Sequence, residues 1–344
     1  MTMEALIDPD KIALAADWVE LAAMLSSRRT SSKADLVRSL SVLEEPEHEL
    51  VNLIIISAEE TSEPMEEEIL QSKSELWASD VREELGTRIA NLGEAYPFEM
   101  VDTGATWRLV YQVQPDRHDH LFYSCCLLIT GRRHSLIRHE IPEMDKVLQV
   151  IAYLVAARIV QGTAYWFGYP RPDETGKMLS AVKELLVRIG FKSADPVAPI
   201  WSVGTEKDEG IDIVAWRNFG DCLPSRLIVY GQVASGKNWM DKPVDQHVSV
   251  FRAWLGDYGQ QYYVPAMFIP WQQYVYVEPT RDRSFRQRVV DLSMRNERTL
   301  GLTVDRGRIA ELATRTTFTG NDDEAEWIRY LVTWRSKVQA TLTE

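Results

Sequence analysis

The first part of the chain has the hydrophobic period of helices. From about Lys11 to Leu92, apolar residues recur at intervals of three and four, as in AADWVELAAMLSS, ADLVRSLSVL and ELWASDVREELGTRIANLG. This spacing gathers apolar side chains on one helix face and predicts several amphipathic helices. Ser32 is a suitable cap for one of them, and Gly93 is a suitable stop for the last. The apolar run at 50–57, LVNLIIIS, fits a buried strand or a helix.

Alternation replaces this pattern near residue 98. The segment YPFEMVDTGATWRLVYQV holds two runs of aromatic and β-branched residues around a turn signal at Asp102 to Gly104. Such runs predict a β-hairpin over 98–113. Residues 1–130 are therefore expected to form a mostly helical N-terminal module with one hairpin.

Residues 131–344 mix helical and strand patterns. Helices are predicted over 142–161 and about 175–189, each followed by a glycine, and two charged helices over 284–298 and 323–340 close the chain. Strands are predicted at 163–168, 210–216, 226–234 and in YVPAMFIP. The polar turn between 210–216 and 226–234 favours an antiparallel hairpin. The expected fold class is α/β, with the helical module followed by a mixed-sheet domain flanked by helices.

Composition places the chain among folded globular proteins. It has 344 residues, of which 45% are hydrophobic and 10% aromatic, enough for two domains with a sizeable core. The formal net charge of -13 argues against a general basic coat for nucleic acid or an anionic membrane. Any site for a polyanion must therefore be local.

The cysteines and the N-terminus indicate a reducing compartment. Cys125 and Cys126 are adjacent and Cys222 is distant, so they form neither a disulfide framework nor a CxxC metal site. The start MTMEALIDPDK is acidic where a signal peptide is basic. The longest apolar runs end well short of the roughly 20 residues that span a bilayer. We expect a soluble, cytoplasmic protein without a membrane partner.

Two polar residues stand in the most apolar strands. Asp212 lies in the run EGIDIVAW, and Gln232 lies in RLIVYGQVA. Burying a carboxylate is costly unless a cation pairs with it, and a divalent metal would serve. Gln232 offers an amide oxygen to an ion or to water. If these strands are neighbours, Asp212 and Gln232 are expected to meet at one end of a sheet.

On these residues the chain resembles the PD-(D/E)XK nuclease superfamily, in the branch whose last acid is a glutamine. The resemblance rests on the helix 142–161, the strand 163–168, the Gly-Ile-Asp strand with Asp212 and the strand with Gln232, within about 142–270. It implies a restriction-endonuclease-like fold, with Asp212 binding Mg²⁺ (or Mn²⁺) and Gln232 assisting. The implied reaction is metal-assisted hydrolysis of a phosphodiester in DNA.

The chain departs from the pattern of that superfamily at two positions. Ala234 stands where the resemblance requires a lysine that orients water, so Lys237 is expected to reach back from a bulge or turn. On the first helix an acid is required where the chain has Gln149. Asp145 lies one helical turn earlier on the same face and could substitute, so either Asp145 or Gln149 is expected to complete the metal site.

Several other features are open to two interpretations. Gly231 to Asn238 nearly matches a P-loop, GxxxxGK[ST], but Asn238 replaces the hydroxyl residue that holds Mg²⁺. His118 and His120 would share a strand face but lack a third metal ligand, so a polar loop is expected there.

Three arginines are weak candidates for contact with nucleic acid. Arg171 lies beside aromatic residues, and Arg283 and Arg286 belong to a basic run that begins at Arg281. That run suits a phosphate backbone or the acidic N-terminal stretch of the same or a second copy, and pairing with a second copy would give a homo-oligomer.

The sequence thus predicts a Mg²⁺-dependent DNA endonuclease, and the resemblance implies a setting in bacterial defence against foreign DNA. The alternative is a catalytically inactive nuclease-fold subunit that acts as a scaffold and binds protein partners through its N-terminal helical module. A third alternative is NTP binding at 231–238.

Overall fold

The computed structural model of the protein contains both helices and sheets, which confirms the α/β class. It describes residues 12–41, 63–112, 114, 116–173, 176–221, 226–259, 262–276, 285–314 and 322–343. Contacts divide the chain into a first unit, Met1–Ile141 with Val332–Glu344, and a second unit, Pro142–Leu331. The division falls after Ile141, beyond the expected 130, and the end of the chain joins the first unit. None of the described helices is long and apolar enough to cross a membrane.

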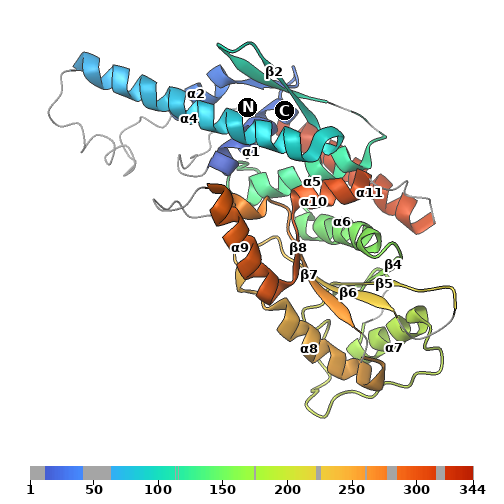
Figure 1. Ribbon diagram of the computed structural model, residues 1–344. Helices are drawn as coiled ribbons and strands as arrows, with labels where there is room; N and C mark the ends of the chain where they lie inside the picture. Colours follow the sequence, from blue (N-terminus) through green and yellow to red (C-terminus); the bar gives the residue numbers. More distant parts are fainter. Residues whose placement is uncertain are drawn as a thin grey trace. The chain divides into compact units, whose positions relative to one another are not determined.

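The first unit packs helices against a small antiparallel sheet (Figure 1). Its helices are α1 (Ile12–Leu25), α2 (Lys33–Ser41), α4 (Glu63–Leu92) and α5 (His118–Arg133), and its strands are β1 (Thr30–Ser32), β2 (Phe98–Asp102) and β3 (Trp107–Tyr111), in the order β1-β3-β2. The predicted hairpin is confirmed as β2 and β3, whose turn holds Gly104 at a φ of +82°. The predicted stop is confirmed too, because α4 ends at Leu92 and Gly93 has a φ of +51°. Residues 50–57 lie outside the described residues.

The polar loop expected at 116–120 is instead the start of a helix. α5 begins at His118, and Asp119 in its first turn pairs with Arg117 at 2.6 Å. An acid is favourable there because the helix N-terminus carries partial positive charge. The ring Nε2 of His120 lies 2.8 Å from the backbone oxygen of Glu94. The loop prediction was therefore wrong.

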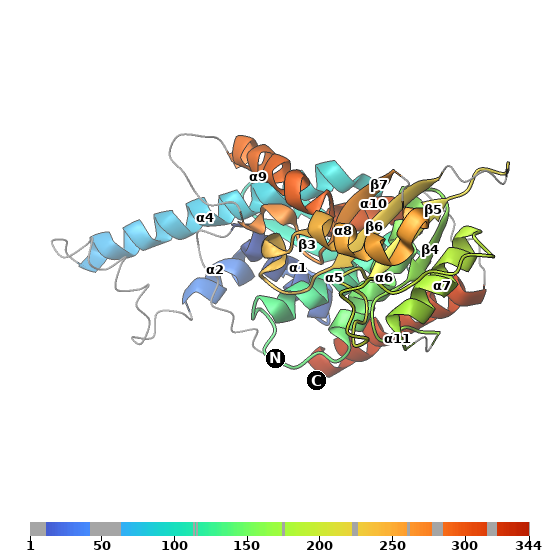
Figure 2. The same ribbon diagram turned by 90° about the horizontal axis from the view of Figure 1, so that it is seen from below.

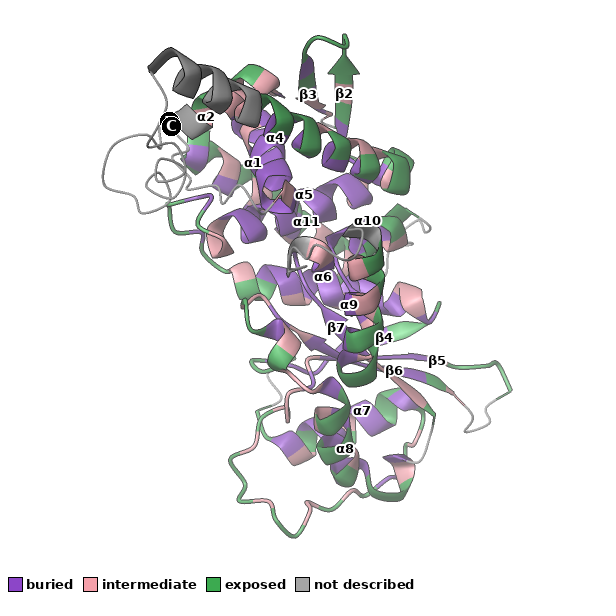
Figure 3. Cartoon of the chain, turned by 60° about the vertical axis from the view of Figure 1, so that its left-hand side comes forward, coloured by how far each residue is buried: buried purple, intermediate pink, exposed green. Residues whose placement is uncertain are grey.

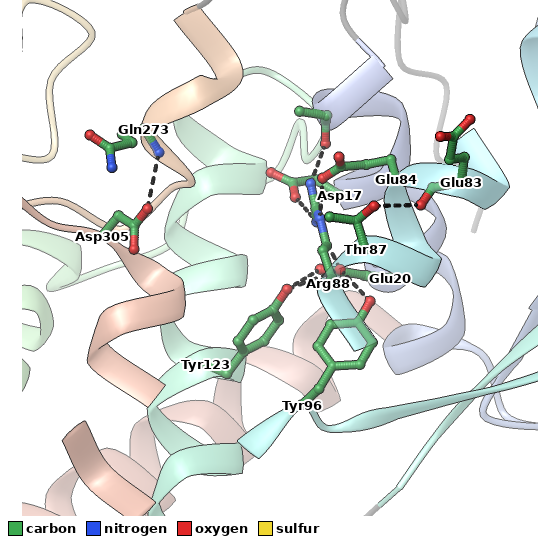
Figure 4. Close-up of polar contacts among 11 residues, drawn as sticks. Asp17, Glu20, Glu83, Glu84, Thr87, Arg88, Tyr96, Tyr123, Gln273 and Asp305 are labelled. Atoms are coloured by element: carbon green, nitrogen blue, oxygen red, sulfur yellow. Dashed lines mark hydrogen bonds and ion pairs between the residues drawn. The ribbon is translucent and has the colours of Figure 1, made fainter. Parts of the chain in front are cut away.

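A buried ionic cluster joins α1, α4 and α5 (Figure 4). The guanidinium of Arg88 donates to Asp17 at 2.6 Å, to Glu20 at 2.7 Å and to Glu84 at 2.7 Å. The hydroxyl of Tyr123 also donates to Glu20, at 2.9 Å. The Arg88 side chain is 1% exposed and those of Asp17 and Glu20 are 0% exposed, so these charges are compensated by one another and not by water.

The second unit is built on a five-stranded mixed sheet. Its strands are β4 (Thr163–Trp166), β5 (Ile213–Arg217), β6 (Leu227–Val233), β7 (Tyr263–Phe268) and β8 (Leu302–Val304), in that spatial order. Its helices are α6 (Met144–Ile159), α7 (Met178–Ile189), α8 (Val244–Leu255), α9 (Phe285–Leu300) and α10 (Arg306–Thr314), with short 3₁₀ turns η3 (Trp239–Asp241), η4 (Gly256–Gly259) and η5 (Gln273–Tyr276). α11 (Asp322–Thr343) begins in this unit. β4, β5 and β6 are antiparallel, whereas β6, β7 and β8 are parallel.

Helices cover both faces of this sheet. α6 packs on β4, β5 and β6 from one side, and α7 and α8 cover the other side (Figures 1 and 2). Side chains on the α7 and α8 side include Trp216, Tyr230 and Met267, which belong to one buried apolar cluster. The predicted helix 142–161 and the predicted hairpin of β5 and β6 are confirmed, whereas β8 and α10 had no sequence prediction.

Candidate functional site

Asp212 is held between the ends of three strands. It directly precedes β5, and its backbone oxygen accepts hydrogen bonds from the N–H groups of Phe167 and Gly168, both at 2.7 Å. Its own N–H donates to the oxygen of Gly231 at 2.9 Å. The β5–β6 register pairs Gly231 with Ile213, so Asp212 sits one position out of register, as in a bulge. This irregularity fixes the carboxylate at the end of the sheet.

The carboxylate accepts two hydrogen bonds. Val233 N–H donates to Oδ2 at 2.7 Å, and Nε2 of Gln149, on α6, donates to Oδ1 at 3.2 Å. Neither donor carries a full charge. Burial therefore raises the pKa of Asp212 from 3.8 to about 7, and the charge of Asp208 adds to the rise, while the Val233 bond and the charge of Lys242 oppose it. A carboxylate in this state changes its protonation near neutral pH.

The raised pKa predicts how stability depends on pH. Because the folded state holds the proton more tightly than the unfolded state, the stabilisation by Asp212 is full below about pH 4 and is lost as the pH rises toward 7. We expect Asp212→Asn to become progressively more stable than the wild type over this range, with an upper bound of about 4 kcal/mol. Urea unfolding in EDTA at pH 5, 6, 7 and 8 measures the difference. A difference that does not change with pH would contradict the prediction.

Gly168 makes room for this carboxylate. A Cβ added to Gly168 would lie 2.6 Å from Asp212 Oδ1 and 3.1 Å from its Cα. We expect Gly168→Ala to displace Asp212 and to destabilise the protein by about 1–3 kcal/mol. Gly176→Ala is the matched control, because a Cβ there meets nothing within 4 Å. Thermal unfolding of both variants tests the expectation, and equal melting temperatures would refute it.

A second carboxylate lies beside the loop after β6. Asp145, in the first turn of α6, accepts a short hydrogen bond from the Ser235 hydroxyl. Asp145 and Gln149 are one helical turn apart, as the sequence predicts, and Gln149 reaches Asp212. Lys237, two residues beyond Ser235, is exposed. The structure thus gathers Asp145, Gln149 and Asp212 near the end of β6.

Gln232 does not join this group. Strand alternation places it with Tyr230 and Met267 on the side of α7 and α8, away from α6. It is 7% exposed, and its Oε1 has no hydrogen-bond partner among the described residues. The carboxylate of Asp212 bonds to Gln149 and to Val233 N–H instead. Ala234 is 1% exposed in the same apolar cluster, so this position brings no amine to Asp212.

The other sequence candidates lie elsewhere. Arg171 is 4% exposed, donates to the backbone oxygen of Lys207 and lies 4.6 Å from the ring centre of Phe167, so its guanidinium is not offered to a phosphate backbone. Arg283 lies outside the described residues, as does the side chain of Arg286. The P-loop geometry is absent from the described segment 231–238, because Gly231 is paired within β6 and the turn η3 follows.

Asp208 and Lys242 act on Asp212 through their charges and were not anticipated. Asp208 accepts hydrogen bonds from the N–H groups of Tyr169 and Gly210, both at 3.0 Å, which ties the loop before β5 to the loop after β4. In the sequence, GTEKDEG at 204–210 indicates only a charged turn and gives Asp208 no role. For Lys242 no signal was present, because its approach to Asp212 depends on the turn η3.

The donor set fits a hard divalent ion only in part. Within the described residues, no group of three or more His, Cys, Asp or Glu side chains is placed to hold a metal. Mg²⁺ needs fewer protein ligands than three, because it usually keeps several waters and binds one or two carboxylates. Asp212 supplies one, and the amide of Gln149, turned over, would supply an oxygen. A partly buried carboxylate that receives only neutral donors is suited to such an ion.

Comparisons of the chain with protein-family models, with curated proteins and with solved structures found no match.

Proposed function

We propose that the second unit is a Mg²⁺-dependent DNA endonuclease centred on Asp212. The observation that carries the proposal is this carboxylate, which lies at the end of a mixed sheet beneath α6 without a cation among its hydrogen-bond donors. The ion would supply the missing positive charge and lower the pKa of Asp212. The setting in bacterial defence rests on the resemblance alone.

The order of elements supports the same proposal. The helix and the three strands on which the resemblance rests are present as α6, β4, β5 and β6, and the three strands are neighbours in one sheet. Asp212 precedes the middle strand, and α6 brings Gln149 to it. The resemblance requires a metal-binding acid at the position of Asp212 and a further site residue on the first helix, where Gln149 lies.

Each residue of the site has a role that its contacts define. Asp212, when ionised, and the Gln149 amide would hold the ion, which would supply Lewis-acid chemistry to the phosphate and to water. The N–H of Val233 fixes the orientation of the Asp212 carboxylate. Asp145, bonded to Ser235, can accept a proton at its carboxylate, and Lys237 offers an exposed positive charge for the DNA backbone.

A second function, that of an inactive scaffold subunit, is favoured by one observation. Ala234 is packed in the apolar cluster and Gln232 lies on the side away from α6, so two positions of the expected site contribute nothing near Asp212. A sheet with Ala234 and Gln232 at these positions would then serve as a binding scaffold and not as a catalyst. Protein partners of the helical first unit would then carry the function.

Cleavage of supercoiled plasmid by the full chain separates the two functions. For the nuclease we expect nicking or linearisation with Mg²⁺ or Mn²⁺, none in EDTA, and a rise in melting temperature on adding the metal. The scaffold predicts no cleavage with either metal and no change in melting temperature. ATP turnover that Lys237→Ala abolishes would contradict both and revive the P-loop alternative.

A further inference from the structure

The loop before β5 exposes an unusual amount of apolar surface. In the segment 195–209, Val197 is 79% exposed, Ile200 is 105% exposed and Val203 is 80% exposed. Single exposed aliphatic residues are ordinary, whereas three of them within one short loop indicate a surface that another molecule covers.

This loop is anchored by contacts with α8 and within itself. The ring of Trp201 packs edge-on against Trp254 of α8, with ring centres 5.9 Å apart. The carboxylate of Glu206 accepts hydrogen bonds from Val203 N–H at 2.7 Å and from the Ser202 hydroxyl at 3.0 Å. A loop that is already ordered loses little entropy when it binds, which favours a role in association.

Two helices that follow this loop also expose apolar side chains. Trp254 links the loop to α8, and α8 packs on α9, so the loop, α8 and α9 follow one another along one side of the unit (Figures 1 and 3). Val250 on α8 is 41% exposed, and Val290 and Met294, one turn apart on α9, are 44% and 56% exposed. Leu292 and Leu300 of α9 are buried, so its outer side carries Val290 and Met294.

The two ends of this surface have opposite charge. Between Asp195 and Glu209 the loop has four acidic residues and one lysine. α9 has four arginines and two acids, and Arg295 and Arg298 are exposed beside Met294. When a second copy is rotated by 180° and placed on this face, its negative end meets the positive end of the first copy, and the reverse.

We propose that this face binds a second copy of the chain about a twofold axis that passes over α8. Because α8 lies between the loop and α9, such an axis places the acidic loop of each copy on the basic α9 of the other. The contact is thus used twice, as in the isologous interfaces of most dimers. The proposal does not depend on the nuclease function.

The area is sufficient for a dimer. Seven exposed apolar side chains contribute from each copy: Val197, Ile200, Trp201, Val203, Val250, Val290 and Met294. Each offers on the order of 100 Å². Both copies together then bury roughly 1,000 Å² or more, the size at which specific interfaces begin.

Sedimentation of the full chain tests the proposal. We expect a dimer at about 10–100 µM in low salt that weakens at 1 M NaCl, because screening removes the attraction between loop and helix. Ile200→Asp with Val203→Asp should give a monomer, and Met294→Glu should weaken the dimer at least tenfold. Leu76→Asp is the control, since Leu76 is 66% exposed in the first unit. At concentrations where the wild type is also a monomer, all variants should keep its melting temperature, because the replaced side chains then lie in water.

Cross-linking tests the geometry. An Ile200→Cys chain mixed with a Met294→Cys chain should form a disulfide-linked dimer on oxidation, and neither chain alone should do so efficiently. The proposal fails if the wild type is a monomer at 100 µM. It fails equally if the loop variants remain dimeric, or if the only effect of Ile200→Asp with Val203→Asp is weaker binding of DNA by a monomer.

Discussion

Asp212→Asn is expected to lower metal-dependent cleavage of DNA by about 10²–10³-fold, and to abolish the rise in melting temperature that the metal causes in the wild type. Asparagine has the same shape and can still accept the hydrogen bond from Val233 N–H, but it has no negative charge for the ion. The loss therefore reports the charge and not the fold. Rates of plasmid nicking at saturating Mn²⁺ measure it.

Two further variants make this result specific. Gln149→Leu removes the partner of Asp212 Oδ1 without changing a charge and should cost about 10–100-fold in activity or metal affinity. Asp257→Asn removes an exposed carboxylate of the same unit and should leave the rate unchanged. If Asp212→Asn cleaves as fast as Asp257→Asn, any nuclease activity of the chain arises elsewhere.

The affinity of the site for the metal should increase with pH. Without metal, Asp212 is half protonated near pH 7, so metal and proton compete for one carboxylate. We expect the apparent metal affinity to rise as the pH rises from 6 to 8. A wild-type affinity independent of pH over this range would show that the ion does not bind Asp212.

Arg88→Met is expected to destabilise the first unit by about 3–5 kcal/mol, the largest effect on stability that we predict. Methionine fills much of the same volume, but it leaves Asp17, Glu20 and Glu84 without their shared cation in a region that water does not reach. Hydrogen exchange of the amides in α1 and α4 measures the loss in this unit directly, which matters because two units can unfold separately.

An exposed ion pair provides the control for Arg88→Met, and a double variant tests whether Arg88 and Glu84 interact. Lys33→Met removes an exposed ion pair with Glu75 at 2.9 Å and should cost about 0–1 kcal/mol. Combining Arg88→Met with Glu84→Leu should cost less than the two single changes together, because the double variant removes one of the stranded charges. Simple additivity of the two changes would show that Arg88 acts through packing and not through its charge.

Most of the elements could be predicted because their signals are local. The apolar period of 142–161 and the alternation of 226–234 follow from side chains near one another in the chain, and both elements are present. No helix was predicted for α5, because its first turn is polar and the run that follows is buried all round, which hides the helical period. β8 has only three residues and is defined by pairing with β7, a contact that no local pattern contains.

The sequence by itself determined the α/β class, the hairpins, the unusual position of Asp212 and the helical turn that joins Asp145 to Gln149. Only the tertiary structure decided which groups meet Asp212. The hydrogen bond from Asp212 N–H to Gly231 oxygen is one residue out of register with the β5–β6 pairing, and the Asp212 carboxylate bonds to Gln149 and Val233 N–H. Alternation along β6 places Gln232 on the other side of the sheet. The reason is physical: helix and strand periods act over a few residues, whereas the pairing of strands depends on contacts between residues far apart in the chain.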